Sequence, residues 1–181
     1  MKGIVFTEFL EIVEGEFGLA VADRIIEGAQ LAHGGAYTSV GTYDHNEFIR
    51  LIVGLSEATG IAVPDLMRLA GMRLFGRLAA RYPEFFAGLR SSFQLLERIE
   101  DHIHVEVRKL YPDAELPTII CERPDAQHLT LTYRSSRPFG VLAEGLIGGC
   151  IAHFAEAIDM TTTDLSGGSA THLRFSLTRS C

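Results

Sequence analysis

The feature that most constrains the fold is a change in the spacing of apolar residues near Pro112. Before it, apolar residues recur every three or four positions, which is typical of amphipathic helices. After it, a β-branched run, a Pro-Asp turn and a two-residue alternation predict strands. One further helical stretch, "FGVLAEGLIGGCIAHFAEAI", interrupts these strands. Helices followed by an antiparallel sheet with one inserted helix indicate an α+β fold.

Glycines and prolines divide the chain into elements, and its 181 residues are enough for one domain with its own core. The spacing predicts helices over about 2–17, 18–32, 44–59, 64–80, 83–89, 91–111 and 138–157. Strands are expected at about 118–123, 127–135, 158–165 and 170–178.

Charge and cysteine content argue against several classes of partner. The net charge is −7 at pH 7 and no block of Lys or Arg is present, so a nucleic-acid partner is not expected. Four glutamates between residues 8 and 16 interrupt the apolar N-terminus, which disfavours an export signal or a membrane span. Cys121, Cys150 and Cys181 are scattered and odd in number, so we expect no disulfide framework and a cytoplasmic protein.

His104 is a candidate buried ligand. It follows Ile103 at the border of the apolar stripe of the expected helix 91–111, and it faces inward more than His102 does. On an α-helix these two imidazoles point about 200 degrees apart, so they do not bind one metal together. The spacing alone also fits a helix-border histidine without a function.

A second candidate group lies on the strand "HLTLTYRSSR". Tyr133, Ser135 and, if the strand continues, Arg137 share one side of it. A phenol, a hydroxyl and a guanidinium form a compact row of donors, and the arginine fork suits a carboxylate or a phosphate. The alternative is that Arg137 pairs with one of the protein's own carboxylates.

Other catalytic signatures are missing. "GLIGG" at 145–149 lies within a helical pattern rather than after a strand, so it favours close helix packing over phosphate binding. No nucleophile elbow or cysteine signature supports a hydrolase.

Four segments together resemble a known family. "MKGIVFTEFLE", "IHVEVRKLYPDAELP", "YRSSR" and "AEGLIGG" are similar to bacterial haem-nitric oxide/oxygen binding (H-NOX) domains, and the resemblance spans nearly the whole chain. It implies a single domain of two lobes, a helical distal lobe of about 1–63 and a lobe of about 64–181 holding the proximal helix and the sheet. The resemblance also implies a haem b between the lobes.

The resemblance also implies roles for individual residues. His104 matches the proximal iron ligand, and Tyr133, Ser135 and Arg137 match the residues that hold the propionates. Pro117 matches a proline that bends the porphyrin. Gly71 and Gly145 match glycines assigned as hinges between the lobes. The expected apolar distal pocket is lined by Val5, Phe9, Leu74, Leu78, Leu142 and Leu146.

Two departures from other family members refine this interpretation. Some relatives hold a structural zinc, but the matching positions here are Gly140, Thr162, Leu165 and Leu173, so we expect no zinc. Oxygen-binding relatives place a tyrosine, a tryptophan and an asparagine around the gas. The matching positions here are Leu142, Phe9 and Leu74.

We therefore expect a gas sensor that binds NO and CO but not O₂ at ferrous haem, and that is a receptor rather than an enzyme. Its expected partner is a separate histidine kinase or a diguanylate cyclase/phosphodiesterase. A different class of protein is also open: a haem-independent adaptor whose cleft binds another anionic amphiphile. A haem peroxidase would need polar distal acid-base groups, which the expected pocket lacks.

Overall fold

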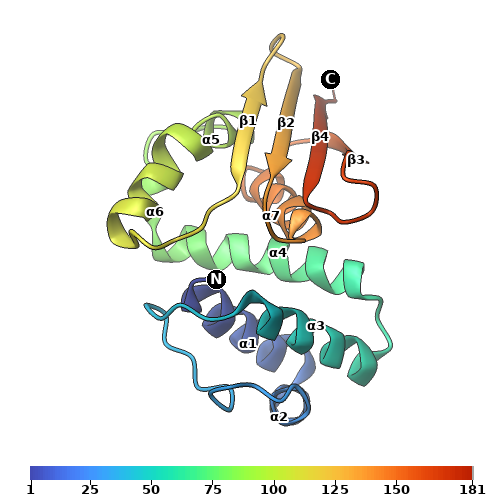
Figure 1. Cartoon of the computed structure of the whole chain (residues 1–181). Helices are drawn as coiled ribbons and strands as arrows, with labels where there is room; N and C mark the ends of the chain where they lie inside the picture. Colours follow the sequence, from blue (N-terminus) through green and yellow to red (C-terminus); the bar gives the residue numbers. More distant parts are fainter. Residues whose placement is uncertain (181) are drawn as a thin grey trace.

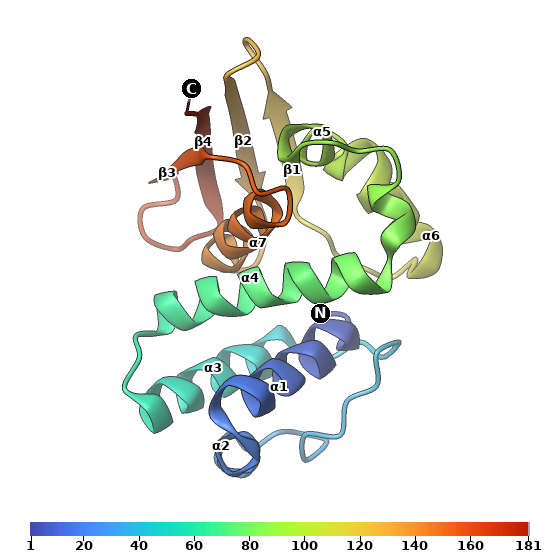
Figure 2. The ribbon, with the colours of Figure 1, turned by 180° about the vertical axis from the view of Figure 1, so that it is seen from behind.

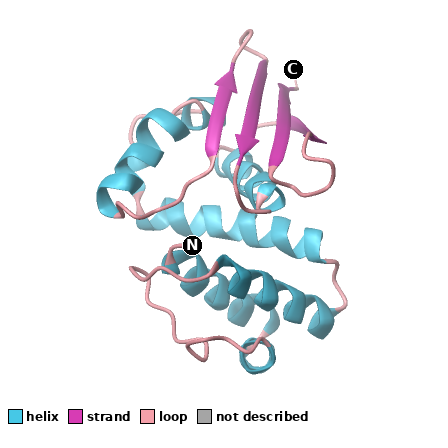
Figure 3. Ribbon diagram, in the orientation of Figure 1, coloured by secondary structure: helices cyan, strands magenta, loops and turns pink. Residues whose placement is uncertain are grey.

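The computed structural model of the protein describes residues 1–180, and Cys181 lies outside them. Helices occupy the first 110 residues, and a four-stranded sheet with one inserted helix follows (Figures 1 and 3). The expected α+β class is confirmed. In both ribbon views one long helix crosses the middle of the molecule, between a group of three helices and the sheet (Figures 1 and 2).

The N-terminal helices are α1 (Gly3–Phe17), α2 (Leu19–Gly28) and α3 (His45–Thr59), and α4 (Val63–Arg81) is the long central helix. Each matches an expected helix, although α2 ends at Gly28 rather than near residue 32.

Local chemistry explains where these helices begin and end. Gly18 has a φ of 90°, which separates α1 from α2 in a conformation that side chains with a Cβ rarely adopt. The Asp44 side chain accepts a hydrogen bond from the Asn46 amide and caps the start of α3. Gly60 ends α3 in the left-handed conformation, with a φ of 75°.

The segment between α4 and the sheet differs most from expectation. The structure has a 3₁₀ turn η1 (Pro83–Phe86), a short α5 (Ser92–Leu96), a π-helical turn η2 (Ile99–Ile103) and α6 (His104–Leu110). The predictions of one continuous helix over 91–111 and of a helix through residue 89 are therefore wrong. Residues 91–111 contain no proline that would explain the π turn, and one of its residues, Glu100, contacts the sheet, as described below.

The sheet contains β1 (Thr118–Glu122), β2 (His128–Arg134), β3 (Ile158–Asp164) and β4 (His172–Arg179) in the order β1-β2-β4-β3. All neighbouring strands are antiparallel, and Ile119, Tyr133 and Leu173 lie side by side across three of them. The four expected strands are confirmed to within about two residues.

Helix α7 (Gly140–His153) packs against α4, and it ends before the expected residue 157. Glycines make this crossing close. A Cβ on Gly71 would overlap the Leu142 carbonyl oxygen, and a Cβ on Gly145 would overlap the carbonyl oxygen of Arg68. Neither glycine has a positive φ, so close packing, as expected for "GLIGG", explains them without a special backbone conformation.

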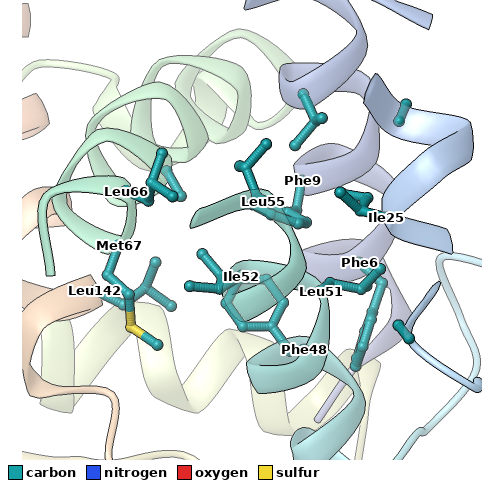
Figure 4. Close-up of a cluster of buried hydrophobic side chains, with 14 of the residues drawn as sticks. Phe6, Phe9, Ile25, Phe48, Leu51, Ile52, Leu55, Leu66, Met67 and Leu142 are labelled. Atoms are coloured by element: carbon teal, nitrogen blue, oxygen red, sulfur yellow. The ribbon is translucent and has the colours of Figure 1, made fainter. Parts of the chain in front are cut away.

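Two buried clusters form the core. The first joins α1–α4 with the start of α7 (Figure 4). The second lies between the sheet, α5 and α7, and includes Phe93, Tyr133, Ile147 and Phe175. Leu66, Met67 and Ala70 of α4 lie beyond the expected boundary between the lobes, but they belong to the first cluster. The boundary near residue 63 therefore stays a prediction.

Candidate functional site

His104 is buried, with 9% of its surface exposed, at the first position of α6. His102 is exposed, in agreement with the expected difference between the two imidazoles. The Nδ1 atom of His104 lies 3.1 Å from Oε2 of Glu100, four residues earlier in η2. Burial lowers the pKa of His104, although the Glu100 carboxylate acts in the opposite direction. Burial therefore favours the neutral imidazole and, with Nδ1 engaged, Nε2 is the ring nitrogen left to act as a ligand.

Glu100 was not identified from the sequence. It lies four residues before a buried histidine, a spacing that places two side chains of a helix together, and this was the signal that could have found it. The carboxylate also accepts hydrogen bonds from the Ile119 amide at 3.0 Å and from the Arg108 guanidinium at 3.3 Å.

Tyr133, Ser135 and Arg137 lie close together, but not along one continuous strand. β2 ends at Arg134, and the Ser135 hydroxyl accepts a hydrogen bond of 3.0 Å from the Arg137 amide in a turn. The condition that the strand continues to Arg137 is therefore not met. Burial raises the pKa of Tyr133, whereas Ser135 and the positive charge of Arg137 lower it. The phenol and the guanidinium thus interact across the turn.

Arg137 pairs with Glu115 of the loop between α6 and β1. This is the alternative that the sequence left open. The Arg137 side chain is 16% exposed and that of Glu115 is 70% exposed. A well-exposed carboxylate contributes little to stability by such a pair and turns easily into solvent. The guanidinium therefore remains suited to another anion.

Pro117 is half-buried in the same loop, two residues after Glu115. This loop is tied to the N-terminal segment, because Asp113 pairs with Lys2 at 3.2 Å and accepts a hydrogen bond of 2.6 Å from Thr42. The sequence did not predict these contacts between distant segments.

The residues expected in the distal pocket come from α1, α4 and α7. Phe9 and Leu142 are 3% and 6% exposed and belong to the first core cluster, where Figure 4 shows both, and Val5 packs against it. Leu74 is 5% exposed, while Leu78 and Leu146 are half-buried. Leu142, Phe9 and Leu74, which match the positions of the polar groups around the gas in oxygen-binding relatives, are thus apolar and buried.

Two tyrosines that pack against this cluster, Tyr37 and Tyr43, carry hydroxyl groups. The Tyr37 hydroxyl donates a hydrogen bond of 2.6 Å to Glu47, and its ring stacks on Phe6. The Tyr43 hydroxyl accepts a hydrogen bond of 2.9 Å from the Thr38 amide. Both hydroxyls are therefore engaged outside the proposed pocket.

Two surface grooves lie elsewhere. One of about 250 Å³ lies between α1 and α4, and another of about 390 Å³ lies between α2 and α3. Neither is lined by a site residue named above. The candidate site is therefore identified by its ligand and hydrogen-bond donor groups, on His104, Tyr133, Ser135 and Arg137, rather than by either groove.

The donors fit a haem. A buried neutral imidazole whose second nitrogen is held by a carboxylate is a suitable axial ligand for iron. A phenol, a hydroxyl and a largely buried guanidinium suit two propionate groups. Within residues 1–180, no group of three or more His, Cys, Asp or Glu side chains could hold a metal ion. The expectation that no zinc is bound still depends on the residue types at the matching positions, which are Gly140, Thr162, Leu165 and Leu173.

None of the helices within residues 1–180 is long and apolar enough to cross a bilayer.

Comparison with known proteins gives one family. A sequence model described as haem-NO-binding matches residues 2–162. A search of curated protein sequences gave no significant match.

Solved structures of H-NOX proteins are similar over the whole chain. The Fe(II) unliganded H-NOX protein from K. algicida is 38% identical, with a TM-score of 0.92 over 100% of this chain and 97% of that one. The IWP-051-bound H-NOX from Shewanella woodyi in the Fe(II)CO state is 43% identical, with a TM-score of 0.85 over 99% and 95%. The S. oneidensis protein in the Fe(II)NO state is 26% identical, with a TM-score of 0.91 over 100% of both chains.

Proposed function

Since the chain belongs to the haem-NO-binding (H-NOX) family, we propose that it is a receptor that binds NO and CO, but not O₂, on ferrous haem. As a member of this family of haem-based gas sensors, it binds haem. The bound haem supplies the ferrous iron to which a diatomic gas coordinates. Gas selectivity and the signalling partner are parts of the proposal.

His104 is the proposed axial ligand. Its burial and lowered pKa favour the neutral form, which is the form that binds a metal without first losing a proton. Glu100 occupies Nδ1 and leaves Nε2 for iron. His102, which is exposed, is not required.

Tyr133, Ser135 and Arg137 are proposed to bind the propionates. Arg137 supplies a charge-assisted fork, and each hydrogen bond to a charged group contributes about 1.5–3 kcal/mol. A propionate would compete with Glu115 for Arg137, and the exposed Glu115 side chain would return to water at little cost.

The apolar distal residues carry the proposed selectivity. Bound O₂ gains partial negative charge and is stabilised by a nearby hydroxyl or amide donor, whereas NO and CO depend much less on one. A donor in a dry pocket contributes about 1–3 kcal/mol, which is one to two decades in affinity. Leu142, Phe9 and Leu74 offer none, and the Tyr37 and Tyr43 hydroxyls are engaged elsewhere.

The signal is proposed to pass to a separate cytoplasmic protein, either a histidine kinase or a diguanylate cyclase/phosphodiesterase. A ligand shifts a two-state equilibrium only when it prefers one state. In related proteins the binding of NO weakens the bond from iron to the histidine, so a change at His104 would distinguish the two states. The haem-independent adaptor loses support because the matching family binds haem.

Optical spectra of the purified ferrous protein test the proposal. We expect a Soret band in the ferrous protein, a six-coordinate adduct with CO and a five-coordinate adduct with NO. In air the ferrous protein should stay unliganded or oxidise. An O₂-bound spectrum that persists for hours would overturn the selectivity. Absence of a Soret band after reconstitution with haem would overturn the sensor itself and favour the adaptor.

A further inference from the structure

The carboxylate of Glu100 is the meeting point of three elements. Its Oε2 atom lies 3.1 Å from His104 Nδ1 and accepts a hydrogen bond of 3.0 Å from the Ile119 amide. Its Oε1 atom accepts a hydrogen bond of 3.3 Å from Arg108. One side chain in η2 thus holds the histidine that begins α6, a guanidinium further along α6, and the backbone of β1.

The contact with β1 occurs at an edge of the sheet. β1 is the outermost strand, so alternate amides of its backbone have no strand to pair with. Glu100 satisfies one of these amides, that of Ile119. Ile119 lies directly opposite Tyr133 in the register of β1 and β2. His104 is therefore connected to β2 in three steps: its contact with Glu100, the hydrogen bond from the Ile119 amide to Glu100, and the pairing of Ile119 with Tyr133.

The electrostatics agree with this geometry. Partial burial raises the pKa of Glu100, but the Ile119 amide, His104 and Arg108 together outweigh that effect and hold the pKa below its ordinary value. The Ile119 amide and the Arg108 guanidinium can only donate hydrogen bonds, so the carboxylate between them acts as an acceptor. The hydrogen bond of 3.1 Å between this acceptor and His104 is therefore donated by Nδ1–H of the imidazole.

From these contacts we infer that Glu100 is a positioning residue for His104: it fixes the tautomer with Nδ1–H and couples the orientation of the ring to β1. The inference rests on the proposed role of His104 and adds to it the residue that prepares the ligand. The π turn supports the assignment, since such turns are rare and often occur at functional sites. Without Glu100, the ring would lose both its fixed proton and its link to the sheet.

Two variants separate geometry from charge. Glu100→Ala removes the acceptor altogether. Glu100→Gln keeps an oxygen that can accept from Ile119 and His104, but it removes the negative charge. Glu106→Gln is the matched control, because Glu106 lies on α6, only two residues from His104, and pairs only with Lys109 among the residues described.

The first measurement uses haem-free protein. In wild type, ¹⁵N NMR of the His104 ring should show the Nδ1–H tautomer alone, and in Glu100→Ala the Nε2–H tautomer should appear. Exchange of the Ile119 amide should become at least about tenfold faster in that variant, as expected for loss of a hydrogen bond to a charged group. Glu106→Gln should match wild type in both measurements.

The second measurement uses haem-loaded ferrous protein. A carboxylate on Nδ1–H makes the imidazole a stronger donor to a metal. Glu100→Gln should therefore keep the Nδ1–H tautomer but lower the iron–histidine stretching frequency, whereas Glu106→Gln should not. This readout also serves if Glu100→Ala fails to fold.

Each failure has a distinct meaning. Wild-type tautomer and Ile119 exchange in Glu100→Ala, or an unchanged stretching frequency in Glu100→Gln, would overturn the inference and leave the proposed function intact. Normal haem binding by His104→Gly without added imidazole would instead overturn the proposed role of His104.

Discussion

Glu8 of α1 and Arg77 of α4 form an ion pair in which the carboxylate is almost completely buried, with 6% of the residue exposed. Arg81 pairs with the same carboxylate at 3.2 Å, and Arg77 also reaches Glu11. Because α4 also packs against α7, this cluster joins the N-terminal helices to the pair of helices beside the sheet.

Arg77→Ala should lower the free energy of unfolding by about 2–3 kcal/mol. The substitution leaves a buried carboxylate with one remaining partner, Arg81, and removing one member of a buried pair is costly. Glu11→Gln is the control, since the Glu11 side chain is 60% exposed and its pair should contribute less than about 1 kcal/mol. Urea denaturation measures both. Equal effects of the two substitutions would contradict the importance of burial at Glu8.

Gly145→Ala should destabilise the protein by about 1–3 kcal/mol, because its Cβ would overlap the backbone of Arg68 at the crossing of α4 and α7. Gly148→Ala, three residues later, meets only Met72 at an ordinary distance of 3.7 Å. It should be neutral or stabilise α7 by up to about 1 kcal/mol. Urea denaturation again provides the comparison. A stable Gly145→Ala variant would show that the crossing can open without cost.

His104→Gly should yield protein that binds haem only when imidazole is supplied, because the glycine leaves no nitrogen ligand in the site. The same change at the exposed His102 should leave the optical spectrum and the haem occupancy unchanged. Titration with imidazole, followed at the Soret band, measures the rescue. Loss of haem from a His102→Gly variant would contradict the assignment of His104 as the iron ligand.

Arg137→Ala should weaken haem retention more than Ser135→Ala does, because the guanidinium carries the charge that complements a propionate. Glu115→Gln removes the competing carboxylate, so it should leave retention unchanged or improve it. Transfer of haem to apomyoglobin gives the rates. Equal rates in Arg137→Ala, Ser135→Ala and wild type would argue against propionate binding by this group.

Leu142→Tyr, combined if needed with Phe9→Trp, should shift the protein toward O₂ binding by adding a hydroxyl to a pocket of buried apolar side chains. The expected gain is about one to two decades in O₂ affinity, with a much smaller change for CO. Leu142→Phe adds a ring without a hydroxyl and is the control. Equal O₂ affinity in the Tyr and Phe variants would locate the determinant elsewhere.

Sequence periodicity was sufficient where local geometry decides the structure. The strand over His128–Arg134 follows from two-residue alternation, and α3 lies where the spacing of apolar residues predicted a helix over about 44–59. The burial of His104 relative to His102 was also predictable, because it depends on which side of an apolar stripe each residue lies. The residue types of the donor row, Tyr133, Ser135 and Arg137, could be read from the sequence, but the turn that holds the last two could not.

The interval from Ser91 to Leu110 was not predictable, since an unbroken helical pattern gives no sign of a π turn. Its stability depends on contacts such as that of Glu100 with Ile119, nineteen residues away. The pairing of Arg137 with Glu115 likewise joins residues twenty-two positions apart.

The sequence by itself determined where the strands and most of the helices lie. It also determined which chemical groups the candidate site contains. Only the tertiary structure decided which carboxylate holds His104 and where the helix before it changes its pitch. Helix and strand periods reflect hydrogen bonds and side-chain spacing over a few residues. A hydrogen bond between Glu100 and the edge of the sheet forms only after the chain has brought η2 and β1 together.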